Sequence, residues 1–261
     1  RPLPQHERVQ VVYLPQAIGQ RAATNLAARI STAPYICKLD AHCAVAHGMD
    51  VALLEAADTL GRTVVQVPLQ KHLHVYDQVC DPCGWRADQA PAVSCCPRCG
   101  GPIRKDLIWK MRKGSTRWRF RADLHFDYRG FAQEGGPYRE TMSCLGACWF
   151  IDRGWFWELG GLDEGHGSYG QMGTEIACKV WLSGGRLVCN TTTEYAHFFR
   201  VGGIGFPYEL RQSDVERARE YSRSVWLNNA WPGQVRPLRW LVDKFWPIEG
   251  WSEEQRDALP S

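Results

Sequence analysis

The sequence predicts an α/β fold in which a mostly parallel sheet is covered by helices on both faces. Apolar runs of strand length alternate with stretches of helix length in the first 70 residues, and the same alternation returns after about residue 140. The chain has 261 residues, 44% of them hydrophobic, which is enough for one large core with a small insert.

The first half reads as strand and helix in turn. Residues 9–14 (VQVVYL) predict a buried strand, and residues 20–30 predict a helix. Strands are expected at 35–39 and 63–69, with a helix at 49–60 between them. The apolar stripe expected to bury the first helix consists of Ala22, Ala23, Leu26, Ala27 and Ile30.

After an interruption, the second half again alternates between expected strands and helices. Its helix at 174–182 ends in Ser183-Gly184-Gly185, a typical C-terminal signal. The other expected elements are a strand at 145–151, a helix at 154–159, a glycine-rich loop at 160–173, a strand at 186–190, a helix at about 209–228 and a Trp-rich helical tail from Pro237.

Composition divides the chain into four regions. A Cys-Pro-Gly segment and a basic aromatic segment interrupt the α/β pattern from Lys71 to about Gly130, so we expect an insert there. The predicted regions are 1–70, the first part of the α/β domain; 71–130, the insert; 131–207, its second part; and 208–261, the helical tail. The abrupt start indicates that N-terminal sequence, with the first strands, is missing.

The net charge and the pattern of apolar residues limit the class of protein that the chain can belong to. The net charge of +3 by itself implies no polyanionic partner, and no run of about 18 uncharged apolar residues predicts a membrane span. The compartment defaults to the cytoplasm, that of the host if the chain is viral. Eight of the twelve Trp residues lie at or beyond Trp155, where they suit either a core or a sugar site.

Two Cys-x-x-Cys pairs predict a zinc ribbon. They lie a short loop apart, and such knuckles bring four thiolates into a tetrahedron around a structural Zn²⁺. The alternative is a set of unrelated buried cysteines, and Cys95 is a spare thiol next to the second pair. The expected ligands are Cys80, Cys83, Cys96 and Cys99.

A basic aromatic segment, residues 104–121, follows the ribbon. Eight Lys and Arg residues face one acid there, with aromatic residues interleaved, a composition suited to phosphates and stacked bases. The alternative is a solvated strand pair with alternating Arg and aromatic residues. As contacts to a nucleic-acid acceptor we expect Arg112, Arg117, Arg119 and Trp118.

A second metal site is expected where strands end. Asp40 and His42 follow the strand at 35–39, and together they can bind a divalent ion such as Mn²⁺ (or Mg²⁺) with positions left for diphosphate oxygens. His197 follows a later strand and can supply a third ligand. Each histidine alone is more often structural.

Five blocks of residues follow one another in a recognisable order. They are 37–43 (CKLDAHC), 141–142 with 146–153 (GACWFIDR), 158–163 (ELGGLD), 175–181 with Gly184 and Gly185, and 196–200 (AHFFR). In this order they resemble the GT-A glycosyltransferases, and they look most like the polypeptide N-acetylgalactosaminyltransferase branch and the related family 2 enzymes. The resemblance covers residues 9–70 and 140–207, about half of the chain.

The resemblance implies a nucleotide-diphosphate sugar donor, UDP-linked, and it assigns roles by position. Asp40 and His42 match the family's Asp-x-His motif, and His197 matches its distal histidine ligand. Gly146 and Ala147 match a small pair beside the donor sugar. Arg200, with the glycine-rich stretch 201–206, matches a segment that closes over the diphosphate.

The chain departs from the family between Tyr169 and Gly173, where relatives carry Trp-Gly-Gly-Glu-Asn. Tyr169 and Gln171 are expected at the donor, but Met172 replaces the carboxylate. Glu175 is the expected catalytic substitute, with Asp163 and Glu164 as further candidates, although Glu175 can also simply charge the helix start. Without that carboxylate we expect transfer with retention of configuration.

The expected function is therefore a metal-dependent glycosyltransferase. The favoured acceptor is a hydroxymethylated base in DNA, as in a phage-type base-modifying enzyme, because of the ribbon and the basic segment. The alternative, from the resemblance, is a Ser/Thr hydroxyl of a polypeptide, or a glycan. An alternative of another class is an inactive zinc-ribbon protein that binds nucleic acid.

Overall fold

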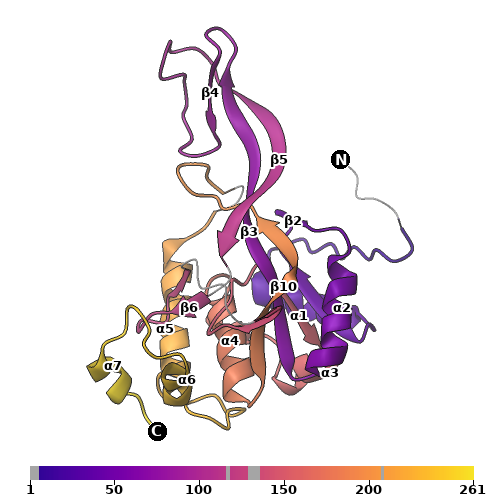
Figure 1. Ribbon diagram of the computed structural model, residues 1–261, viewed down its shortest axis with the longest axis vertical. Coiled ribbons are helices and arrows are strands. Elements are labelled where there is room, and N and C mark those ends of the chain that lie inside the picture. The colour runs from indigo at the N-terminus through magenta and orange to yellow at the C-terminus, as the bar shows by residue number, and fades with distance from the viewer. Residues whose placement is uncertain (1–5, 116–117, 129–135, 207–208) are drawn as a thin grey trace.

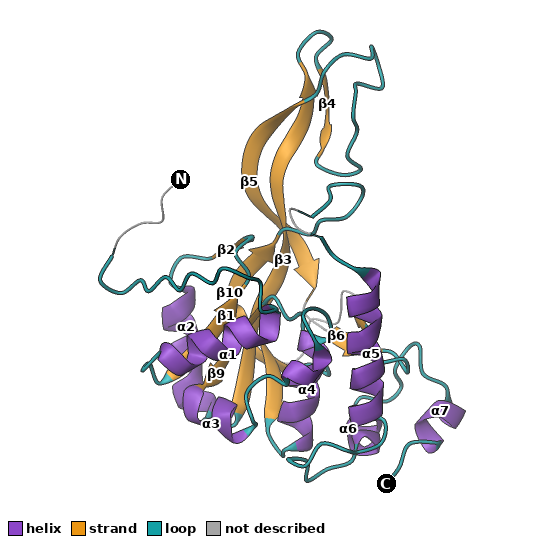
Figure 2. Ribbon diagram, turned by 180° about the vertical axis from the view of Figure 1, so that it is seen from behind, coloured by secondary structure: helices purple, strands orange, loops and turns teal. Residues whose placement is uncertain are grey.

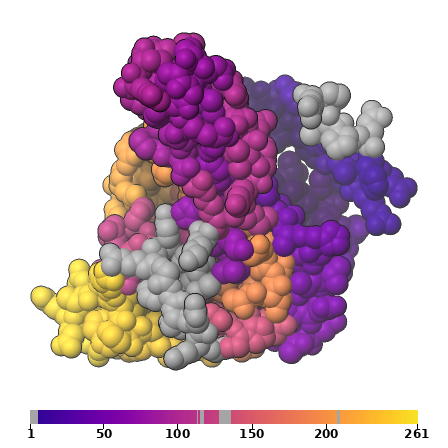
Figure 3. Space-filling view, turned by 45° about the horizontal axis from the view of Figure 1, so that its top comes forward, coloured from indigo at the N-terminus to yellow at the C-terminus, as the bar shows by residue number. Residues whose placement is uncertain are grey.

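The computed structural model describes residues 6–115, 118–128, 136–206 and 209–261. It has an α/β body from which a long arm, residues 70–115, projects (Figure 1). The arm stands as a raised lobe above the body, with the C-terminal elements and the N-terminal segment on opposite sides below it (Figure 3). The α/β class predicted from the sequence is confirmed.

The sheet is mixed, which corrects the expectation of a mostly parallel one. Eight described strands form it, with the path β1-β9-β3-β10-β2; β4 and β5 pair with β3, and β8 pairs with β10. Among the described pairs only β3 with β10 is parallel. The strands are β1 Tyr35–Leu39, β2 Cys43–Val45, β3 Val64–Cys80, β4 Trp85–Asp88, β5 Arg104–Ser115, β8 Tyr138–Glu140, β9 Cys148–Asp152 and β10 Arg186–His197, with β6 Trp118–Phe120 and β7 Phe126–Tyr128 as a separate pair.

Two strands are longer than expected, and this length builds the arm and the site. β3 crosses the expected boundary at residue 70 and runs on into the arm, where β4 and β5 pair with it. β10 continues past a register shift between Asn190 and Glu194 to His197. Apolar patterning predicted only the first part of each strand, because the later parts carry many polar and aromatic side chains although several of these are buried.

The helices largely follow the sequence prediction. They are α1 Gln20–Ile30, α2 Met49–Leu60, α3 Arg153–Glu158, α4 Met172–Leu182, α5 Gln212–Trp226, α6 Leu238–Lys244 and α7 Glu253–Asp257, with a short 3₁₀ turn η1 Glu164–His166. Figure 2 shows α1 and α3 on one side of the body and α4, α5 and α6 on the other. None of the described helices is long and apolar enough to cross a bilayer.

Two N-terminal expectations are wrong. Residues 9–14 form no strand, and Tyr13 is 86% exposed. No described strand pairs with this segment, and an apolar run becomes a strand only beside a hydrogen-bonding partner. Helix α1 has the predicted bounds but turns its polar side inward, because Arg21 and Asn25 are buried and Ile30 is exposed.

The core lies around α4, every residue of which is buried. Trp181 of this helix is fully buried, as are Trp149 and Trp226 in the same core cluster. The indole of Trp181 donates to the carbonyl of Thr141 at 3.1 Å, so its polar atom is satisfied inside the core. These tryptophans therefore cover a core, one of the two roles considered for them.

Candidate active site and metal centres

The ends of three strands bring the predicted metal ligands together. Asp40 follows β1, His42 precedes β2, and His197 is the last residue of β10. β2 pairs antiparallel with β10, with Cys43 opposite His197, and the amide of Phe198 donates to the carbonyl of His42 at 3.1 Å. The backbone pairing itself therefore holds His42 beside His197.

The three side chains form a compact donor set. Nε2 of His197 lies 3.5 Å and Nε2 of His42 lies 4.0 Å from the same Asp40 oxygen, Oδ2, and one ligand atom from each residue lies within 4.8 Å of the others. One carboxylate oxygen and two imidazole nitrogens suit Mn²⁺. All three side chains are partly exposed, so a bound ion would keep positions open to a substrate.

Electrostatics keeps this set ready for a cation. Burial would raise the pKa of Asp40, but the hydrogen bond from His197 and the charge of Lys38 hold it below the ordinary value of 3.8. Burial and then the neighbouring His197 lower the pKa of His42. A carboxylate and a neutral imidazole are the forms that bind metal.

Sequence reasoning missed Lys38, which is 8% exposed. Its Nζ pairs with Asp40 and donates to the carbonyl of Gly146 at 2.6 Å. A usable signal was present, because residues 38 and 40 are two apart at a strand end and so point to the same face. Lys38 thus links Asp40 to the loop that carries the predicted donor residues.

Gly146 and Ala147 do lie beside the metal ligands. The amide of Asp40 donates to the carbonyl of Ala147 at 2.8 Å. A Cβ on Gly146 would stand 3.0 Å from Cβ of Met172 and 3.2 Å from the amide nitrogen of Gly173. Close packing on the start of α4 is therefore one reason for glycine at this position.

The two predicted donor-binding residues that precede α4, Tyr169 and Gln171, differ from each other in their surroundings. Gln171 has a left-handed backbone with φ of 60°, and its Oε1 is buried without a hydrogen-bond partner among the described residues. Tyr169 is half-buried in the same stretch and has partners of its own. This buried amide oxygen keeps an unused capacity to accept a hydrogen bond, and the donor contact expected for Gln171 stays a prediction.

Glu175 lies in an interior ion-pair network and not among the metal ligands. It is fully buried, its Oε2 accepts from Arg21 at 2.6 Å, and Lys179 lies 3.1 Å from its Oε1. The amide of Asp163 also donates to it, at 2.5 Å. Burial would raise its pKa, but Lys179 and Arg21 hold it below the ordinary value. Its surroundings are those of a structural carboxylate.

Arg200 lies three residues after His197, the predicted metal ligand at the end of β10. Its guanidinium lies 5.2 Å from the ring of Phe198, and it donates to the carbonyl of Gly205 at 3.5 Å. The ring of Phe199 packs at 4.4 Å from His197 and at 4.7 Å from His72. A line of rings therefore leads from the metal ligands to the base of the arm.

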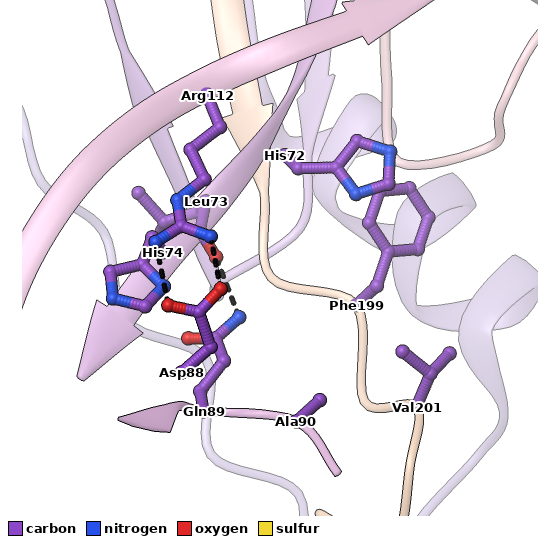
Figure 4. A pocket seen from close by; sticks show the side chains of 9 residues that line it. All are labelled: His72, Leu73, His74, Asp88, Gln89, Ala90, Arg112, Phe199 and Val201. Atoms are coloured by element: carbon purple, nitrogen blue, oxygen red, sulfur yellow. Dashed lines mark hydrogen bonds and ion pairs between the residues drawn. The ribbon is translucent and has the colours of Figure 1, made fainter. Parts of the chain in front are cut away.

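A pocket of about 170 Å³ opens on the far side of Phe199. β3 and β5 supply one wall, residues 88–90 a second, and Phe199 with Val201 a third (Figure 4). Asp88 and Arg112 form a two-bond ion pair in it, at 2.6 and 3.0 Å. The pocket thus joins the arm to the segment that leaves the metal cluster.

His74, Asp77 and Asp88 also have metal-type spacing. Arg86 donates to Asp77 at 2.6 Å, and Arg112 pairs with Asp88. Two guanidinium groups already neutralise these carboxylates, so the cluster has little negative charge left to bind a cation.

The four predicted zinc ligands do converge. Sγ of Cys80 lies 3.5 Å from Sγ of Cys99, Sγ of Cys83 lies 3.5 Å from Sγ of Cys96, and all four sulfurs lie within 4.8 Å of one another. The amide of Arg98 points at Sγ of Cys96 at 3.4 Å, as a zinc knuckle requires. Burial opposes ionisation of Cys96, but backbone amides lower its pKa to about 7.

The residues expected to meet an acceptor are dispersed. Arg112 lines the pocket, Arg119 pairs with Asp127 at 3.1 Å, and Arg117 lies outside the described residues. Trp118 is 3% exposed, so the expectation that it contacts an acceptor does not fit its position in the interior. The exposed aromatic residue of this segment is Trp109 at 58%, where a register shift opposite His74–Tyr76 turns it outward with φ of 51°.

Comparison with known proteins agrees with this architecture. Residues 2–78 match the family model described as glycosyl transferase family 2. The human polypeptide N-acetylgalactosaminyltransferase 10 is 36% identical over 99 residues, which are 37% of this chain and 16% of that protein. The rat polypeptide N-acetylgalactosaminyltransferase 5 is 33% identical over 133 residues, 48% of this chain and 14% of that protein.

A solved structure matches over a larger part. The crystal structure of GalNAc-T7 with UDP, GalNAc and Mn²⁺ covers 85% of this chain and 38% of its own, with a TM-score of 0.61 and 19% identity. The chain spans less than a fifth of the length of these two curated relatives. The fold of this chain is therefore the GT-A fold, and the family model and the relatives that match it are those of glycosyltransferases.

Proposed function

We propose that this chain transfers a sugar from a UDP-sugar to a hydroxyl acceptor with the help of Mn²⁺. The observation that carries the proposal is the meeting of Asp40, His42 and His197, from three separate strand ends, within 4.8 Å. Support for the donor comes from the structural neighbour GalNAc-T7, whose crystal structure is one with UDP, GalNAc and Mn²⁺.

The protein groups have separable tasks in this proposal. Asp40, His42 and His197 would hold the ion, which supplies positive charge to the departing diphosphate. Lys38 orients the Asp40 carboxylate and keeps it ionised. Arg200 lies three residues beyond His197, and its guanidinium suits phosphate oxygens.

The acceptor that the relatives favour is a Ser/Thr hydroxyl of a polypeptide, because the matching proteins are named polypeptide N-acetylgalactosaminyltransferases. The pocket beyond Phe199 is the place we assign to it. The rings of His197 and Phe199 are 4.4 Å apart, so a group held in the pocket is one ring away from the metal ligands.

A hydroxymethylated base in DNA is the second candidate acceptor. It is favoured by the exposed Trp109 on β5, flanked by the exposed Lys105 and Lys110. Against it, Arg104 and Arg112 are paired with Asp81 and Asp88, and carboxylate partners weaken phosphate binding. We therefore place the polypeptide first.

The test is a donor and acceptor panel. Nucleotide sugars with Mn²⁺ are incubated with Ser/Thr peptides or with hydroxymethylated DNA, and both acceptors are analysed by mass spectrometry. Asp40→Asn should abolish donor hydrolysis and transfer, whereas Asp58→Asn on the exposed face of α2 should change neither. Absence of donor turnover by the wild-type chain with every sugar would favour the inactive nucleic-acid-binding alternative.

The stereochemical course belongs to the same proposal. Met172 is 3% exposed and has no group that can accept a proton, and Glu175 is fully paired in the interior. Retention of configuration is therefore the outcome we propose. NMR couplings of the first-formed product distinguish retention from inversion.

We also propose a structural Zn²⁺ at Cys80, Cys83, Cys96 and Cys99. The tip of the arm has few apolar side chains, so a closed four-thiolate site would supply most of its folding energy. Such a site needs reduced thiols, which agrees with the cytoplasmic compartment expected from the sequence.

A further inference from the structure

We propose that the arm is a positioning device for the active site: its turn at Ala90–Ala92 anchors the segment 199–206, and so sets where Phe199 and Arg200 stand relative to the metal ligands. The inference rests on the proposed function for its kinetic consequence. The anchoring itself is a structural claim and can be tested without any activity.

The arm and the segment 199–206 meet at a backbone contact of Gly202, which we call the joint. Its carbonyl accepts from the amide of Ala92 at 2.7 Å. A Cβ on Gly202 would lie 3.1 Å from Cβ of Ala90 and 3.2 Å from Cα of Pro91, so a side chain at this position would crowd the turn. In Figure 1 the segment after β10 lies directly beneath the arm loop that contains this turn.

A second contact lies two residues further on. Ile204 packs against a small apolar cluster separate from the main core. Leu73 and Tyr76 bring β3 of the arm to this cluster, and Phe198 brings the end of β10. Arm and segment thus share buried apolar surface as well as a hydrogen bond.

The arm side of the joint is itself held in place. Gln78 is 3% exposed, and its Nε2 donates to the carbonyls of Asp88 at 2.6 Å and Pro91 at 2.9 Å. Its Oε1 accepts from the amide of Val93 at 2.8 Å. Gln78 is two residues before Cys80, so the proposed zinc site and the Ala90–Ala92 turn are fastened to the same stretch of β3.

The other side of the joint leads to the site. Phe199 packs on His197, and Arg200 stands two residues before Gly202. Displacement of Gly202 would therefore move the aromatic ring beside a metal ligand and the guanidinium proposed for the diphosphate. Gly202, Ala92 and Gln78 act through these groups and are positioning residues.

The experiment compares Gly202→Val with Gly205→Val. Both glycines have positive φ, +64° and +73°, so the backbone strain of valine is similar, but a Cβ at Gly205 meets nothing within 4 Å. We expect Gly202→Val to speed amide hydrogen exchange at Ala92 and across 199–206 by roughly tenfold, and Gly205→Val to leave Ala92 unchanged. Gln78→Leu should reproduce the first result with the zinc content intact.

Kinetics adds the functional readout. Gly202→Val should raise the KM for the UDP-sugar or lower kcat by about three- to tenfold, the scale of one lost hydrogen bond, while thermal unfolding stays close to that of Gly205→Val. Unchanged exchange at Ala92 would overturn the anchoring. Faster exchange with unchanged kinetics would overturn the positioning role. A wild-type chain without activity would refute the proposed function, and the exchange data would still decide the anchoring.

Discussion

The substitution Glu175→Gln tests whether the carboxylate of Glu175 has a structural or a catalytic role. The substitution keeps the shape of the side chain but removes the charge that faces Arg21 and Lys179, whose side chains are 1% and 4% exposed. The two buried cations would then keep hydrogen bonds to backbone carbonyls, Arg21 to that of Gly170 and Lys179 to that of Gly161, but would lose the carboxylate that faces them both. Breaking a buried pair on one side typically costs about 3–5 kcal/mol.

For a chain of this size that cost lowers the melting temperature by roughly 10 °C. The assay is calorimetric or circular-dichroism melting of wild type, Glu175→Gln, Arg21→Met and the double variant. The double variant should recover part of the loss, because removal of both charges leaves less uncompensated charge in the interior. Activity per folded molecule should stay near that of the wild type in Glu175→Gln.

The pH dependence of stability gives an independent check. The pKa of Glu175 lies below its ordinary value of 4.5, so its contribution to stability is present above about pH 4.5 and is lost as pH falls through the folded-state pKa. Glu175→Gln should therefore flatten the acid limb of the stability curve. An unchanged melting temperature with lost activity would refute this reasoning and return Glu175 to the catalytic group.

Further perturbations test the metal sites and the second acceptor. His197→Gln should reduce transfer by more than about 100-fold, beyond the usual cost of losing an outer-shell partner, whereas exposed His47→Gln should not; turnover at saturating Mn²⁺ measures both. Elemental analysis should find one zinc per chain, which Cys83→Ser loses and exposed Cys95→Ser keeps; less than half an equivalent in the wild type would exclude the ribbon. If DNA is the acceptor, Trp109→Ala should weaken single-strand binding by about 1–3 kcal/mol in a filter assay, and with a polypeptide acceptor it should leave transfer intact.

Short local patterns in the sequence predicted several features of this chain correctly. The helix at 20–30 has its predicted bounds because propensity and a Gly start act over one or two turns. The Cys80–Cys99 spacing places the four thiols together because the knuckles are short and nearly self-contained. Asp40 and His42 likewise share one turn, so their proximity required no knowledge of the fold.

The remaining features depend on contacts between segments that are distant in the sequence. Local patterns do not predict which of these segments become neighbours. Residues 9–14 have a strand pattern and no described partner strand, so they form no strand and are exposed. Glu175 sits one turn from a predicted donor stretch, yet Arg21, 154 positions away in sequence, makes it an interior ion. The sequence was enough to predict which side chains gather in the two clusters of possible metal ligands, since residue chemistry and short spacing indicate them. The contact of Ala92 with Gly202, the inward polar face of α1 and the pairing of the basic residues arose from packing between distant segments, which no local pattern encodes.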